Sequence, residues 1–109
     1  PAANALCNLD TNDVIPPLTE LLKDSDVFVR VSVVDILGKL NAREVIPQLI
    51  GFLKDRDESM RGAASRALGK LGAKDAIPQL TELLKDSKAS VRRFAAYALG
   101  NLGAKEAIP

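Results

Sequence analysis

The chain has 109 residues, 47% of them hydrophobic and 4% aromatic, and its 15 Lys and Arg against 14 Asp and Glu leave a formal charge of +1. This balance disfavours a protein whose affinity comes mainly from neutralising phosphates. Without histidine, and with Cys7 as the single cysteine, the chain alone cannot build the usual zinc sites or histidine-dependent triads, so we expect no catalytic residue, metal ligand or cofactor.

A lone thiol cannot form an internal disulfide bond, which is typical of a protein from a reducing compartment. The sequence contains nothing that resembles a signal peptide and no apolar run long enough to span a bilayer. We therefore expect a cytoplasmic protein.

One repeat organises the whole chain. Ile-Pro occurs at 15–16, 46–47, 77–78 and 108–109, always 31 residues apart, and eleven of the 31 positions carry the same residue in all three full units. We expect a single domain that contains a partial unit (1–13), full units at 14–44, 45–75 and 76–106, and the start of a further unit (107–109). Both ends would then be cut within a unit of a longer protein, and the uncapped apolar end faces would favour end-to-end self-association.

In chain order, residues 1–13 match the later half of a second helix, and each full unit then predicts a pair of helices. The first helix follows an acidic residue, carries proline in its first turn and ends at a lysine. These residues are Asp13, Glu44 and Asp75 at the start, and Lys23, Lys54 and Lys85 at the end. A short polar turn follows, with side-chain oxygens suited to cap the second helix.

The second helix of each unit has apolar residues with the spacing of one helical face. The predicted buried residues are Val29, Val33, Ile36, Leu37 and Leu40, then Met60, Ala64, Ala67, Leu68 and Leu71, then Val91, Ala95, Ala98, Leu99 and Leu102. Glycine recurs inside these helices at Gly38, Gly69 and Gly100, which predicts a close approach of neighbouring helices. Cys7 occupies the equivalent position in the partial unit and is expected to be a small buried residue. Gly72-Ala73 and Gly103-Ala104 should end the helices.

Helices of this length are marginal in water, and a single hairpin leaves apolar surface uncovered. The units must therefore stack side by side. We expect an all-α fold, an α-solenoid or superhelix of about three and a half stacked antiparallel helical hairpins.

The motif A-I-P-x-L-x-x-L-L-K-D-x-x-x-x-V-R-x-x-A-x-x-A-L-G-x-L-G, nearly complete at 76–103, resembles HEAT repeats of the short type that also occurs in phycobilisome bilin lyases. This resemblance covers essentially the whole chain. It implies that aspartate and arginine residues near the turn between the two helices pair within and between units. The matching residues are Asp24, Asp55 and Asp86 with Arg30, Arg61 and Arg92, and across six residues each carboxylate is within reach of its arginine. We favour a structural ladder of these aspartate–arginine contacts over a site that binds a ligand.

The exposed positions of the second helices differ between units and are the candidates for function. By resemblance to HEAT repeats they would line the concave side. The candidate partner-binding residues are Phe28, Val31, Asp35, Lys39, Arg66, Lys70, Arg93 and Tyr97, with Ser59, Gly62, Ser90 and Asn101 at further exposed positions. Four cations against one carboxylate, with two aromatic anchors, suit an acidic or amphipathic segment of another protein.

We therefore predict a non-catalytic scaffold that binds a peptide or protein partner, without contact to a membrane. A purely structural interpretation stays open, in which Phe28 and Tyr97 pack on their neighbours and the charges keep the surface hydrated. The alternative function is a lobe of a bilin lyase-like enzyme assembly that holds its substrate protein. Binding of a nucleic-acid backbone through Lys39, Arg66, Lys70 and Arg93 is disfavoured by the near-neutral charge.

Overall fold

The computed structural model describes residues 11–103, and within this range the chain forms helices and turns without a β-strand. The first hairpin consists of α2 (Thr11–Glu20), the short 3-10 helix η1 (Leu21–Lys23) and α3 (Val27–Lys39). The second consists of η2 (Arg43–Val45), α4 (Ile46–Phe52) and α5 (Glu58–Lys70). The third consists of η3 (Lys74–Ala76), α6 (Ile77–Glu82), η4 (Leu83–Lys85) and α7 (Ala89–Gly103).

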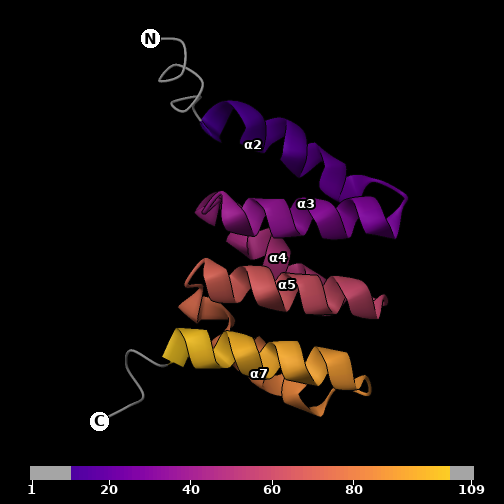
Figure 1. Cartoon of the computed structure of the whole chain (residues 1–109), viewed down its shortest axis with the longest axis vertical. Helices are drawn as coiled ribbons and strands as arrows, with labels where there is room; N and C mark the ends of the chain where they lie inside the picture. The colour runs from indigo at the N-terminus through magenta and orange to yellow at the C-terminus, as the bar shows by residue number, and fades with distance from the viewer. Residues whose placement is uncertain (1–10, 104–109) are drawn as a thin grey trace.

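The second helices of the hairpins form one layer of the molecule. In Figure 1, α3, α5 and α7 run as three neighbouring rows, and α4 lies behind the rows of α3 and α5. Helix α5 packs against both α3 and α7. The arrangement is the predicted α-solenoid, in which each hairpin covers the apolar face of the next.

Local residue chemistry sets the ends of the second helices. At the starts of α3 and α5, the carboxylates of Asp26 and Asp57 accept hydrogen bonds from the backbone N–H two residues later, at 2.8 and 2.7 Å. These bonds confirm the predicted caps of α3 and α5, whereas before α7 the carboxylate of Asp86 accepts from the N–H of Lys88, one residue ahead of the helix. After α5, Gly72 has a φ of +67°, and Asn41, 31 residues earlier, has a φ of +58°. Both residue types adopt the left-handed conformation more readily than others, which allows the chain to turn into the next hairpin.

The first helices differ from the prediction in two hairpins, and in the second of these α4 ends at Phe52, before Lys54. Pro47 and Pro78 lie at the starts of α4 and α6, as expected, each after a 3-10 turn. Helix α2, however, begins at Thr11, before Asp13, so Pro16 lies inside the helix. Proline lacks the N–H that would bond to the carbonyl four residues earlier, and here that carbonyl lies in the first turn of α2.

The core is most complete in the middle hairpin. All five residues predicted to be buried in the second helix of this hairpin, four in α5 and Leu71 at its C-cap, are at most 1% exposed. In the outer hairpins Val29, Leu40 and Leu99 are only partly buried. Ile36 is 40% exposed, which corrects its predicted burial. Its equivalents Ala67 and Ala98 pack against the preceding hairpin, whereas no described hairpin precedes Ile36.

The inner glycines allow the second helices to approach closely. A Cβ atom on Gly38 would lie 3.2 Å from the Cα of Ala67, and one on Gly69 would lie 3.0 Å from the Cα of Ala98. These distances confirm the predicted contact at two of the three glycines. A Cβ on Gly100 would have nothing within 4 Å, so the predicted contact is not found at this glycine. Cys7 lies outside the described residues.

Candidate functional site

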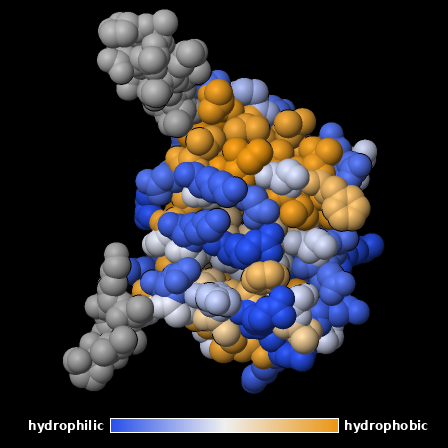
Figure 2. All heavy atoms as spheres, viewed as in Figure 1, coloured by the Kyte–Doolittle hydropathy of each residue, from blue (hydrophilic) through white to orange (hydrophobic). Residues whose placement is uncertain are grey.

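The structure brings the eight candidate partner-binding residues onto the layer of second helices. Phe28, Val31, Asp35 and Lys39 belong to α3, Arg66 and Lys70 to α5, and Arg93 and Tyr97 to α7. Among the described large hydrophobic residues, the two aromatic side chains are the most exposed, at 72% for Phe28 and 69% for Tyr97. In the view of Figure 2, hydrophobic residues gather over α2 and α3, whereas hydrophilic residues dominate over α5 and α7.

Arg66 has defined partners on both sides. Its guanidinium group donates to both carboxylate oxygens of Asp35, each at 3.2 Å, and this ion pair links α5 to α3. The same group lies 4.6 Å from the ring centroid of Phe94 on α7, and Arg93 lies 5.2 Å from that centroid. Both distances fit cation–π interactions. Arg66 therefore connects all three second helices.

Phe94 is part of the site, although the pattern of exposed positions did not indicate it. Its ring is partly buried against Gly62 on α5, where a Cβ atom would lie only 3.0 Å from the ring. Gly62 is buried, which corrects its predicted exposure. The sequence does contain a signal at two neighbouring positions of the repeat. Phe94 stands where the other units have Ser32 and Ala63, and Gly62 stands where they have Val31 and Arg93.

Two hollows lie on this face, and Arg66 and Phe94 form a wall shared by both. Hollow A has a volume of about 250 Å³ and lies between α5 and α7. Hollow B has a volume of about 280 Å³ and extends across α3, α5 and α7. Besides the shared wall, hollow A is lined by Lys70, Tyr97, Ala98 and Asn101, and hollow B by Phe28, Val31, Glu58, Ser59, Gly62 and Ser90.

The aspartates and arginines near the turns are in contact, but within each hairpin the accepting atom is not the predicted carboxylate oxygen. Within each hairpin the arginine donates to the backbone carbonyl of the aspartate: Arg30 to Asp24, Arg61 to Asp55 at 2.8 Å, and Arg92 to Asp86 at 2.6 Å. The carboxylate instead accepts the backbone N–H two residues later in all three turns. The carboxylate is used by the turn, which leaves the backbone carbonyl as the acceptor for the arginine.

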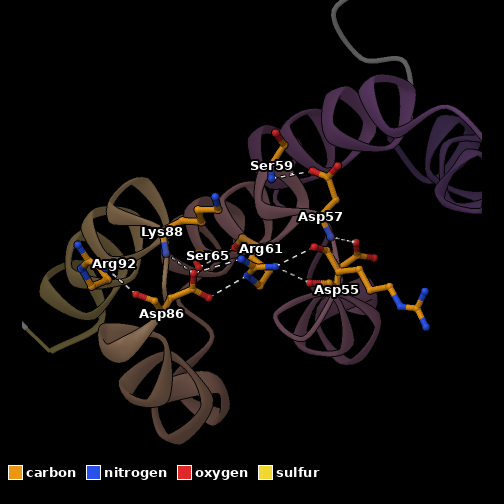
Figure 3. A network of polar contacts seen from close by, with 9 residues as sticks. Asp55, Asp57, Ser59, Arg61, Ser65, Asp86, Lys88 and Arg92 are labelled. Carbon is orange, nitrogen blue, oxygen red and sulfur yellow. Dashed lines mark hydrogen bonds and ion pairs between the residues drawn. The ribbon is translucent and has the colours of Figure 1, made fainter.

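Between the inter-helix turns of neighbouring hairpins, the described residues form one aspartate–arginine ion pair. Nε of Arg61 lies 2.8 Å from the carboxylate of Asp86, and a second guanidinium nitrogen donates to the other carboxylate oxygen at 3.1 Å. Figure 3 shows Arg61 between the turns that contain Asp55 and Asp86. Among the described residues Arg30 and Asp55 do not form the equivalent pair.

The surroundings of Asp86 lower its pKa. Partial burial raises the pKa of this carboxyl group, but the hydrogen bonds from Arg61 and from the N–H of Lys88, together with the positive charges of Arg61 and Arg92, outweigh that effect. The Asp86 side chain is only 10% exposed, so the ion pair is well shielded from water. This contact joins the second and third hairpins and lies at the inter-helix turns, apart from the hollows.

In residues 11–103 no group of three or more acidic, histidine or cysteine side chains is placed to hold a metal ion. Within the same range, every helix is too short or too polar to cross a membrane.

The stacked hairpins define an α-solenoid repeat protein. In a comparison with known families, the chain matches HEAT repeats over residues 2–64 and again over residues 46–109, and it belongs to this family. HEAT repeats generally serve as protein-interaction scaffolds and are typically not enzymes. The match does not single out the bilin lyase type, which stays a prediction. A search of curated proteins finds no match.

Proposed function

We propose that the chain is a non-catalytic scaffold that binds a peptide or protein segment on the face formed by α3, α5 and α7. The observation that carries this proposal is the pairing of two highly exposed aromatic side chains, Phe28 and Tyr97, with the two adjoining hollows. Exposed aromatic residues beside a concave surface are typical of the anchors of protein interfaces.

The charged residues of the face support binding over acid–base chemistry. Asp35 is the only carboxylate among the eight candidate residues, and it is bonded to Arg66 through both of its oxygens. A general base must reach the proton that it removes, and this carboxylate is occupied by its partner on α5. Arg66 and Asp35 thus hold the face in shape.

Photo-crosslinking in cells of the source organism tests the proposal. Tyr97 is replaced by a photoreactive phenylalanine analogue in the intact protein, and the same analogue at Leu84, which is 40% exposed in η4, provides the control. We expect covalent protein adducts from position 97 that are absent or much weaker from position 84. Adducts from position 84 alone, no adducts at all, or adducts that a nuclease removes would contradict the proposal.

A double variant gives an independent measurement. Phe28→Ser with Tyr97→Ser is expected to abolish capture of the crosslinked protein, while the melting temperature stays close to that of the wild type because both side chains lie mostly in water. If capture and melting temperature fell together, the two aromatic residues would serve packing and not binding.

A further inference from the structure

The two hollows differ in charge. Hollow A is lined by two cations, Arg66 and Lys70, and by no carboxylate. Hollow B is lined by three apolar side chains, by Glu58 and by Arg66, whose charge is paired with Asp35. The face is therefore mainly apolar at hollow B, with one carboxylate at Glu58, and cationic at hollow A.

Lys70 is the cation at hollow A whose charge is not balanced by a carboxylate of the described residues. The charge of Arg66 is balanced by Asp35, with two oxygens at 3.2 Å. Lys70 is exposed in the last turn of α5, and no carboxylate of the described residues pairs with it. An exposed ammonium group beside a partly apolar hollow attracts an anion that also brings an apolar group into that hollow.

We propose that the partner segment is acidic, with a carboxylate that pairs with Lys70 at hollow A and a large apolar side chain that fills hollow B. This inference rests on the proposed function of the face. Arg66 and Phe94 line both hollows, and the proposal assigns the acidic residue and the apolar residue of the segment to different hollows. Phe28, Val31 and Phe94 surround the apolar anchor, and charge complementarity orients the segment with its acidic residue toward the C-terminal ends of α5 and α7.

A nucleic acid fits this face less well. Its phosphates would meet the carboxylate of Glu58 at hollow B and the apolar side chains of Phe28 and Val31. An acidic peptide avoids these conflicts because its charge and its apolar anchor are on separate residues.

Selection from a displayed library of random peptides on the immobilised chain tests the inference. We expect enriched sequences to combine aspartate or glutamate with an aromatic or large aliphatic residue at a fixed spacing. Lys70→Glu should weaken binding of these peptides about tenfold and remove the preference for acidic residues in a new selection. Phe28→Ser should weaken the same peptides without changing that preference.

Lys85→Glu is the control. Lys85 is an exposed lysine in the last turn of η4, lies outside the candidate partner-binding residues and lines neither hollow. We expect its replacement to change binding by less than about threefold, through long-range charge alone. Equal losses in both variants, or enriched peptides without acidic residues, would overturn the inference and leave the proposed function standing. A library from which no peptide is enriched would overturn both.

Discussion

Asp86 carries two kinds of contact that its counterparts in the other hairpins do not combine. Like Asp24, its carboxylate accepts the backbone N–H two residues later, but it also pairs with Arg61 of the preceding hairpin. Asparagine keeps an acceptor for the turn and loses the charge. We expect Asp86→Asn to lower the free energy of unfolding by about 1–2 kcal/mol in urea denaturation. Asp24→Asn, the matched control, should lower the free energy of unfolding by less than about 0.5 kcal/mol. Equal losses in the two variants would show that the ion pair with Arg61 adds no stability.

The same carboxylate makes stability depend on pH. Because the pKa of Asp86 in the folded chain lies below the ordinary value of 3.8, its ion pair contributes fully above pH 3.8. That contribution is lost as the pH falls through the lowered value in the folded chain. Denaturation at a series of pH values should therefore show the largest difference between the wild type and Asp86→Asn above pH 3.8 and a shrinking difference below it. A difference that stays constant into strong acid would contradict the assigned direction.

At the scale of the helices, the contact between α5 and α7 depends on a missing side chain. A Cβ on Gly69 would lie 3.0 Å from the backbone Cα of Ala98, which cannot move aside alone. We expect Gly69→Ala to lower the free energy of unfolding by about 1–3 kcal/mol, although alanine is the better helix former. Thermal and urea denaturation measure this loss.

Gly100 provides the control because it lies at the equivalent position of α7, where an added Cβ would have no neighbour within 4 Å. Gly100→Ala should raise the free energy of unfolding by about 0.5–1 kcal/mol through helix propensity alone. If both substitutions raised the free energy of unfolding, α5 and α7 would be able to move apart around the added Cβ without a loss of stability.

The helices themselves were predictable from sequence because their signals are local. The helical spacing of apolar residues, the aspartate caps and the glycine after α5 act within a few residues of the chain, and the structure confirms them. What the pattern could not predict depends on the neighbouring hairpin. Ile36 fits the apolar stripe of α3 but is 40% exposed, whereas its equivalents Ala67 and Ala98 pack against the second helix of the preceding hairpin.

The candidate site also combines features that local sequence predicts with features that depend on a neighbouring helix. Placing the exposed residues of α3, α5 and α7 on one face required only the 31-residue period. The wall of Arg66 and Phe94 was missed because the Phe94 ring reaches across to Gly62 on another helix. A helical-face pattern treats each helix alone and assigns Gly62 to solvent. Likewise, the spacing of Arg61 and Asp55 predicted their proximity but not which oxygen accepts the hydrogen bond.

At the scale of the whole molecule, stability should decrease from the second hairpin to the third. Helix α5 is covered on both sides, by α3 and by α7, and Leu37 and Leu68 are completely buried. Leu99, at the same position of α7, is only partly buried. In a repeat protein each unit is stabilised mainly by its neighbours, and among the described second helices α5 contacts one on each side.

This gradient predicts different outcomes for the same truncation. Leu68→Ala should lower the free energy of unfolding by about 2–5 kcal/mol, and Leu99→Ala by roughly half as much, because less buried surface is lost. Hydrogen exchange gives the sharper measurement. Because α5 contacts both neighbouring second helices, Leu68→Ala should reduce amide protection in α3, α5 and α7 together, whereas Leu99→Ala should act mainly on α6 and α7. If protection fell uniformly in both variants, the hairpins would unfold as one cooperative unit, with no weaker outer hairpin.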